Sequence, residues 1–236
     1  MYKKYTNKEI LSRIDHRPWK LPEKPWIYYQ EWNTPIFLHW AVDAKELESL
    51  LPPELELDVH ENKAWISLVP FQIKIKPRFL PSFPLLSSFD EVNLRTYVKH
   101  QGKSGVYFLN IEAGKRVSAW LAHKLSGLPY IYASMKHEKE FFTSENNQQK
   151  NRLKLDYQIN ELITEPSKTD LWLSERYALF TVKNNKVTTY DVHHMPWKLH
   201  RLSLREIHVD YPAYKHLMQG APSLTHYAHG VQVLCF

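Results

Sequence analysis

The chain has 236 residues, 43% of them hydrophobic and 24% charged, which is enough to bury a substantial core in one domain. Its single cysteine excludes an intramolecular disulfide, and nowhere do about 18 apolar residues, the length of a membrane-spanning helix, run together. The N-terminus has no apolar signal-peptide core, so we expect a cytoplasmic protein without a membrane partner. The net charge of +6 is spread along the chain without a zinc-finger, recognition-helix or RNA-binding pattern, which argues against nucleic acid as the partner.

Residues 1–25 are predicted to form a short helix followed by an extended lead-in. Thr6 has the character of a helix N-cap for residues 7–14. Pro18, Pro22 and Pro25 then hold the chain extended, because proline cannot continue a helix.

Beyond the lead-in, hairpin patterns dominate and short helices separate them. Asp43 and Glu46 resemble a capping box for a helix at 43–51, and helical spacing of apolar residues predicts another at 115–126. A helical turn is expected at 171–175, capped by Thr169-Asp170, and a polar loop at 143–150. Strands are expected at 35–42, 55–59, 64–71, 72–76, 89–100, 105–112, 130–142, 153–159, 177–183, 186–193, 199–209 and 230–236.

This order of elements is typical of an α+β domain whose mostly antiparallel sheet curls into a barrel or cone. No shift in composition and no flexible linker marks a boundary, so residues 1–236 are expected to form a single domain.

A proline-rich segment spans residues 70–86 and overlaps the strand expected at 72–76. It contains four prolines together with Phe79, Phe83 and Leu85-Leu86, an unusual length of rigid and apolar chain. The segment could pack flat over the core or close over a pocket as a lid, and the pattern does not decide between the two.

The clearest polar constellation is Glu91, Asn93 and Arg95. On a strand these residues project from one face, while the intervening Val92 and Leu94 project from the other. The polar face could be solvated, with Glu91 and Arg95 as a weak surface pair. Alternatively it could line a cavity, where the carboxylate handles protons and the guanidinium binds an anion. The aromatic neighbours Phe89 and Tyr97 favour the cavity.

Arg176 and His194 are further candidates for contact with a ligand. They belong to segments 174–177 and 193–197, which lie at the ends of expected elements, where functional side chains are common. The same segments could equally serve packing alone.

None of the thirteen histidines, including those at 193, 194, 200, 226 and 229, has the spacing of a metal site, so no metal is predicted. No phosphate loop or nucleophile elbow is present, and no cofactor is expected.

Several stretches, taken in order, resemble the YqjF-like family of uncharacterised bacterial proteins. The most specific is the Glu-x-Asn-x-Arg-Thr-Tyr-Val pattern at 91–98. The others are at 37–40, 50–52, 64–71, 105–109, 127–130, 173–177, 194–197 and 224–227. The resemblance covers residues 26–236.

That family is similar, more distantly, to acetoacetate decarboxylase, and the resemblance implies a cone-like antiparallel barrel around a central pocket. The decarboxylase uses a lysine that forms a Schiff base, directly after a proline that follows a short helix. Here Tyr130 follows Pro129, and a phenol cannot form an imine. The resemblance also places Glu91 at a pocket carboxylate of the decarboxylase, and Lys124 near the position of a helical glutamate.

We therefore expect a protein that binds a small organic acid or related metabolite in an interior pocket, with or without turnover. Glu91 would act as acid or base and Tyr130 would donate a hydrogen bond, while Arg95, Asn93, Arg176 and His194 would contact the ligand. One alternative is a lyase that uses another lysine, Lys124 or Lys136. Another is a non-enzymatic nucleic-acid or protein-interaction module, and association with a second copy of the chain is left open.

Overall fold

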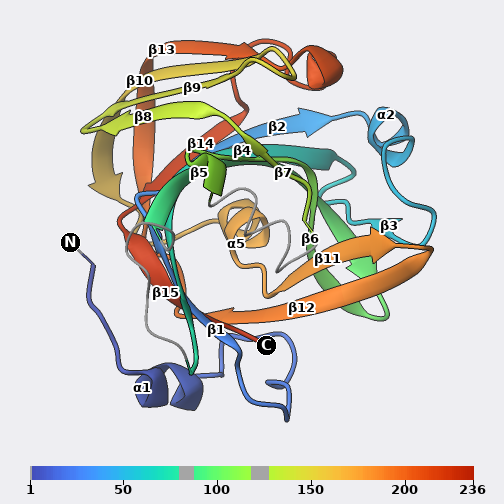
Figure 1. The fold of residues 1–236 in the computed structure, drawn as a ribbon, viewed down its shortest axis with the longest axis vertical. Coiled ribbons are helices and arrows are strands. Elements are labelled where there is room, and N and C mark those ends of the chain that lie inside the picture. The colour runs from blue at the N-terminus through green and yellow to red at the C-terminus, as the bar shows by residue number, and fades with distance from the viewer. Residues whose placement is uncertain (1, 80–87, 118–127) are drawn as a thin grey trace.

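One curled sheet forms the body of the molecule in the computed structural model, which describes residues 2–79, 88–117 and 128–236 (Figure 1). The strands are β1 Tyr28–Asn33, β2 Ile36–Val42, β3 Glu56–Leu57, β4 Ala64–Pro77, β5 Ser88–His100, β6 Lys103–Ala113, β7 Tyr130–Tyr132, β8 Ser134–Glu138, β9 Phe141–Asn146, β10 Asn151–Leu162, β11 Ala178–Lys183, β12 Lys186–His194, β13 Leu199–Asp210, β14 Leu224–Ala228 and β15 Gly230–Cys235. The described helices are α1 Asn7–Ser12, α2 Ala44–Glu48 and α5 Lys168–Ser174, with a 3-10 turn at Pro212–Tyr214. Within the described ranges no helix is both long and apolar enough to cross a bilayer.

The long strand β4 closes part of this sheet into a barrel. Its first half pairs with β2, its second half pairs with β1, and most of its length pairs with β5. The ring β4-β5-β6-β11-β12-β15-β1 therefore returns to β4, which leaves these strands without a free edge. Strands β2, β14, β13, β10, β9 and β8 continue from β4 as a second layer, while β3 pairs with β5 and β7 pairs with β6. Pairing is antiparallel except where β6 meets β7 and β11.

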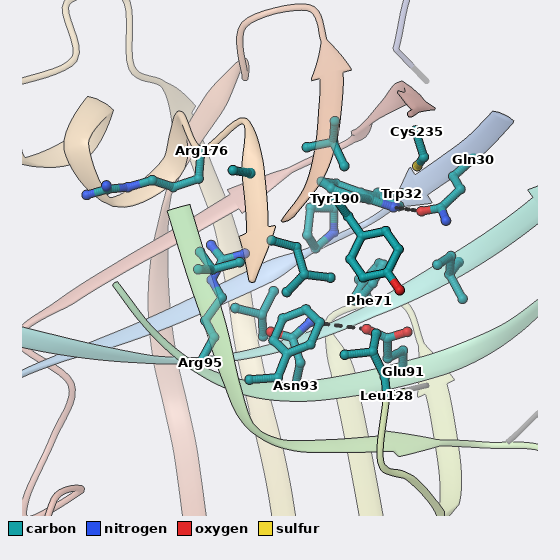
Figure 2. Close-up of a pocket in the computed structure, with 18 of the residues that line it drawn as sticks. Gln30, Trp32, Phe71, Glu91, Asn93, Arg95, Leu128, Arg176, Tyr190 and Cys235 are labelled. Atoms are coloured by element: carbon teal, nitrogen blue, oxygen red, sulfur yellow. Dashed lines mark hydrogen bonds between the residues drawn. The ribbon is translucent and has the colours of Figure 1, made fainter. Parts of the chain in front are cut away.

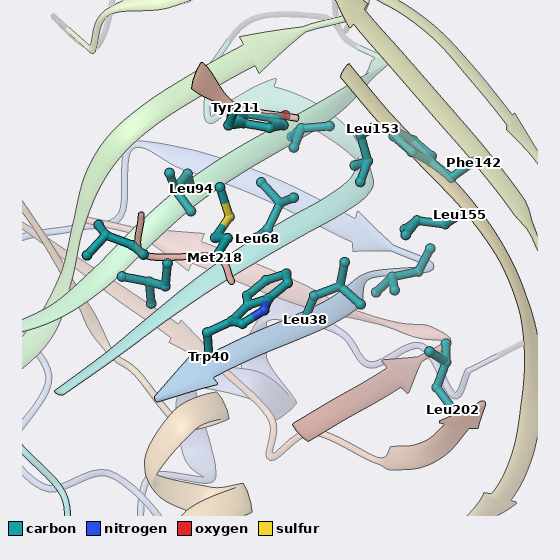
Figure 3. Close-up of a cluster of buried hydrophobic side chains, with 14 of the residues drawn as sticks. Leu38, Trp40, Leu68, Leu94, Phe142, Leu153, Leu155, Leu202, Tyr211 and Met218 are labelled. Atoms are coloured by element: carbon teal, nitrogen blue, oxygen red, sulfur yellow. The ribbon is translucent and has the colours of Figure 1, made fainter. Parts of the chain in front are cut away.

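The first half of β4 and the middle of β5 are largely buried on both faces because they lie between the barrel interior and the second layer. Alternate residues such as Leu68 and Leu94 point outward and pack with Leu153, Leu155 and other apolar side chains of the second layer (Figure 3). The intervening residues point into the barrel. Helix α5 is drawn over the opening of the ring in the view of Figure 1, and the hydroxyl of Tyr97 of β5 donates to the carbonyl of Leu173 in this helix at 3.0 Å.

The predicted mostly antiparallel curled sheet is confirmed, and several boundaries differ. Segments 64–71 and 72–76 form one strand, whereas 130–142 is divided between β7, β8 and the start of β9. The second helix ends at Glu48 and not at 51, and Ser167 replaces Thr169-Asp170 as the cap of α5. The predicted helix at 115–126 falls largely outside the described residues, as do residues 80–87 of the proline-rich segment.

The expected polar loop at 143–150 is wrong in its first half, which forms strand β9. Ser144 and Asn146 are buried there, and both donate hydrogen bonds to the carboxylate of Glu112 on β6, at 3.4 and 2.8 Å. Tyr211 and Asn151 donate to the same carboxylate. Because the buried carboxylate of Glu112 accepts their hydrogen bonds, these polar side chains can be buried in a strand.

Candidate functional site

A cavity of about 260 Å³ lies inside the closed ring of strands (Figure 2). Its wall is mostly apolar, and several large aromatic side chains contribute to it. These are Trp32, Phe37, Phe71, Phe108, Tyr190 and Trp197. The polar groups that reach the cavity are consequently few, and the apolar surroundings strengthen the electrostatic interactions among them.

Strand β5 supplies the main polar row of this wall. Glu91, Asn93 and Arg95 face the cavity, while Val92 and Leu94 belong to the core under the second layer. Glu91 is 2% exposed and Asn93 is 3% exposed, so this face is not the solvated surface that the sequence left open. The register of β5 on β6 shifts between Leu94 and Arg95, a bulge of the kind that redirects a side chain.

Glu91 is held by two hydrogen-bond donors. The hydroxyl of Tyr130 donates to Oε2 at 2.8 Å, and Nδ2 of Asn93 donates to Oε1 at 3.2 Å. Burial raises the pKa of Glu91 to about 7, although both hydrogen bonds oppose that shift. A carboxyl group with this pKa exchanges its proton readily near neutral pH, as a general acid or base must.

Tyr130 reaches Glu91 because β7 adds to the edge of β6. Tyr130 lies opposite Ile111 of β6, and Glu91 lies opposite Ala113 of the same strand. Burial, followed by the neighbouring carboxylate, raises the pKa of Tyr130 well above its ordinary value. The phenol therefore remains protonated and acts as a donor.

Arg95 presents an unsatisfied cation to the cavity. Its Nε and Nη2 atoms are buried and have no hydrogen-bond partner in the described structure. The guanidinium carbon lies 5.6 Å from the ring centre of Phe37 and 5.9 Å from that of Tyr97. Nε and Nη2 form the edge of a guanidinium that takes a carboxylate through two parallel hydrogen bonds. The rings of Phe37 and Tyr97 stabilise the positive charge of Arg95, but they do not hydrogen-bond to its Nε or Nη2.

Arg176 is a second cation in the wall, and it is paired. Its Nη1 lies 2.7 Å from Oδ2 of Asp58, and its Nε donates to the carbonyl of Trp172 at 2.7 Å. The guanidinium also stacks over the ring of Trp172, at 4.1 Å from the ring centre. Arg176 follows α5, so this helix positions it. Because Asp58 balances its charge, Arg176 binds an anion less readily than Arg95.

His194 is the one predicted site residue that does not line the cavity. It is fully buried at the end of β12, where its Nδ1 lies 2.8 Å from the carbonyl of Met195. Its ring stacks on Tyr177 with ring centres 4.8 Å apart, and it packs against the cavity residue Trp197. Burial lowers the pKa of His194, which keeps the ring neutral.

The structure also places residues in the wall that the sequence analysis missed. Gln30 and Trp32 come from β1, and the indole of Trp32 donates to Oε1 of Gln30 at 2.7 Å. Cys235 joins them from β15, and burial raises the pKa of its thiol to about 12. The available signal for β1 was its aromatic content, Tyr28, Tyr29 and Trp32, because aromatic residues favour strands.

The lysines of the described residues lie outside the cavity wall. Lys136 is on the surface with its side chain 64% exposed, 2.9 Å from Glu138. Lys124 falls outside the described residues.

Among the described residues, no group of three or more His, Cys, Asp or Glu side chains is arranged to hold a metal ion. Of the histidines considered for a metal site, His193 has its Nε2 2.8 Å from the carbonyl of Ile10.

Comparison with solved structures identifies the fold. Acetoacetate decarboxylase from Legionella pneumophila superposes with a TM-score of 0.61 and 15% identity, covering 99% of this chain and 96% of that one. The enduracididine biosynthesis enzyme MppR, in a structure with pyruvate, superposes with a TM-score of 0.55 and 12% identity, covering 93% and 90%. These likenesses establish an acetoacetate decarboxylase-like fold, as the sequence resemblance implied.

Comparison of sequences identifies the family. The chain is 37% identical over 235 residues to the uncharacterized protein YqjF of Bacillus subtilis (strain 168), covering 95% of this chain and 97% of that protein. Residues 29–232 match the family model DUF2071, described as an uncharacterized conserved protein. The predicted resemblance to YqjF-like proteins is confirmed, and the chain belongs to the DUF2071 family.

Proposed function

We propose that the protein binds a small organic acid in the barrel cavity, with the carboxylate of the ligand on Arg95. The observation that carries this proposal is the free Nε/Nη2 edge of Arg95, buried beside a mostly apolar cavity. Two buried N–H groups without an acceptor are costly, and a bound carboxylate satisfies both through a bidentate, charge-assisted pair. The aromatic wall accommodates the apolar body of the ligand.

Glu91 serves as the acid or base of this site, and Tyr130 as its hydrogen-bond donor. Its pKa of about 7 suits proton exchange with a bound ligand, and the 2.8 Å hydrogen bond from Tyr130 orients one of its oxygens. The pyruvate named in the MppR structure, a small carboxylic acid in a barrel of similar fold, supports an acid as the ligand.

The proposed chemistry does not pass through a Schiff base. Tyr130 occupies the position where the decarboxylase resemblance expects a lysine, and the described wall residues include no lysine. Incubation with pyruvate, acetoacetate or other keto acids under borohydride is expected to leave no covalent adduct. A trapped lysine, identified by mass spectrometry of peptides, would overturn this part of the proposal.

Thermal-shift measurement with a panel of monocarboxylic acids tests the binding site. A ligand that binds only the folded state raises the unfolding temperature, and we expect such a shift with the wild-type protein and not with R95M. R201M is the matched control, because Arg201 is 68% exposed and pairs with Glu161 on the surface. Equal shifts in R95M and R201M would contradict the proposal.

A further inference from the structure

We propose that the acid bound by this cavity is a hydroxy acid, and that Asn93 selects its hydroxyl group. This inference rests on the proposed function and adds the chemical class of the ligand. Asn93 is 3% exposed and lies between Glu91 and Arg95 on the inner face of β5.

The side-chain amide of Asn93 has one satisfied end and one unsatisfied end. Its Nδ2 donates to Oε1 of Glu91 at 3.2 Å, whereas its Oδ1 is buried without a hydrogen-bond partner in the described structure. The carboxylate fixes this orientation, because turning the amide over would bring two oxygen atoms together. The wall of the cavity therefore contains a buried acceptor without a donor, and a ligand can supply that donor.

The spacing along β5 lets one small molecule satisfy both residues. Alternate residues of a strand are about 7 Å apart, and Asn93 is the polar cavity residue two positions before Arg95 on β5. A carboxylate on the free edge of Arg95 places the next carbons of the ligand toward Asn93, where a hydroxyl group donates to Oδ1. The apolar wall, including Phe37 and Trp197, encloses the remainder of the molecule.

Related acids without a hydroxyl group leave Oδ1 unsatisfied. An unsubstituted acid offers no donor, and a keto acid opposes its own carbonyl oxygen to Oδ1. A buried acceptor without a partner weakens binding by roughly tenfold relative to one that is paired. The expected order of affinity is hydroxy acid first, with the unsubstituted and keto acids behind it.

Calorimetric titration with acids of one skeleton tests this order. The probes are phenyllactate, 3-hydroxy-3-phenylpropionate, 3-phenylpropionate and phenylpyruvate, measured above the pKa of Glu91 so that its carboxylate is ionised. We expect at least one hydroxy acid to bind about tenfold more tightly than 3-phenylpropionate. In N93A this advantage is expected to disappear while 3-phenylpropionate still binds.

The variant E91Q provides a second readout that a merely structural role would not produce. Glu91 accepts from Tyr130 at one oxygen and from Asn93 at the other, and glutamine keeps only one acceptor. When that acceptor stays with the Tyr130 hydroxyl, the amide nitrogen faces Asn93 and donates to its Oδ1, so Asn93 turns over and presents Nδ2 to the cavity. The preference is then expected to change from the hydroxy acids to phenylpyruvate, whose carbonyl accepts.

The outcomes separate this inference from the proposed function. If the wild-type protein binds all the probes equally and R95M binds none, the anion site stands and the role of Asn93 is refuted. An unchanged hydroxy preference in N93A or in E91Q would also refute it. If none of the probes binds the wild-type protein, both proposals fail for acids of this size.

Discussion

The hydroxyl of Tyr130 donates to Oε2 of Glu91 at 2.8 Å, inside a barrel whose interior is otherwise mostly apolar. The two residues are 39 positions apart in the sequence and meet only because β7 and β5 both pair with β6. Burial raises the pKa of Glu91 and this hydrogen bond lowers it, so the acidity of the site depends on their balance.

The raised pKa of Glu91 makes the folded state less stable as pH rises. The folded protein binds the proton up to about pH 7, whereas the unfolded chain releases it near its ordinary value of about 4.3. Stability associated with Glu91 is therefore present below the unfolded pKa and declines as pH rises toward 7. We expect E91Q to lose this decline, with a gain over the wild type of about 3 kcal/mol above pH 7.

Denaturant unfolding of both proteins across this pH range measures the difference directly. Other carboxyl groups, such as Asp170 and Glu31, have lowered pKa values and contribute in the opposite direction, but they are common to both proteins. A constant difference between E91Q and the wild type at all pH values would contradict the raised pKa.

Removing the hydroxyl of Tyr130 should make Glu91 a weaker acid. In Y130F the carboxylate loses a donor that favours its charged form, so its pKa is expected to rise further. The loss of this hydrogen bond should also lower the free energy of unfolding by about 1–2 kcal/mol at pH values at which Glu91 is ionised. Titration of the Glu91 carboxyl by infrared difference spectroscopy, with E91Q as the reference, checks the direction. A lower pKa in Y130F would be inconsistent with this hydrogen bond.

The polar row of this site could be predicted from the sequence, because its residues are close neighbours on one strand. The side chains of β5 alternate, so the grouping of Glu91, Asn93 and Arg95 on one face follows from spacing alone. The burial of these three side chains does not follow from spacing, because it depends on the pairing of β4 with both β1 and β5, which closes the barrel. The pairing of Arg176 with Asp58, 118 positions away, likewise has no signal in spacing.

Strand β1 was missed because polar residues are buried on both of its faces. Gln30 faces the cavity and is bonded to Trp32, while Glu31 accepts hydrogen bonds from Lys4 and Tyr29 on the other side. A strand of this kind lacks the apolar–polar alternation by which strands are usually recognised. The fold class was nevertheless predicted correctly, because the hairpins β5–β6 and β11–β12, which specify antiparallel pairing, were placed as observed.

The two arginines of the cavity should differ sharply in their effect on stability. R176M leaves Asp58 buried with only Lys99, 3.0 Å away and 45% exposed, as its counter-charge. Breaking a buried ion pair in this way costs about 3 kcal/mol. R95M removes a cation that has no ion-pair partner in the described structure, and we expect it to be neutral or stabilising without ligand. Urea unfolding compares the two, and equal losses would contradict the assignment of Arg95 as the free cation.

The Nε–H resonance of Arg95 in the NMR spectrum tests the central claim most directly. The signal is assigned by its absence in R95M, and phenyllactate or another carboxylic acid is then added to the wild-type protein. We predict that this resonance moves to lower field and saturates at one equivalent of bound acid, as an N–H that gains a carboxylate partner does. A bound acid that leaves the Arg95 signal in place would show that the anion lies elsewhere.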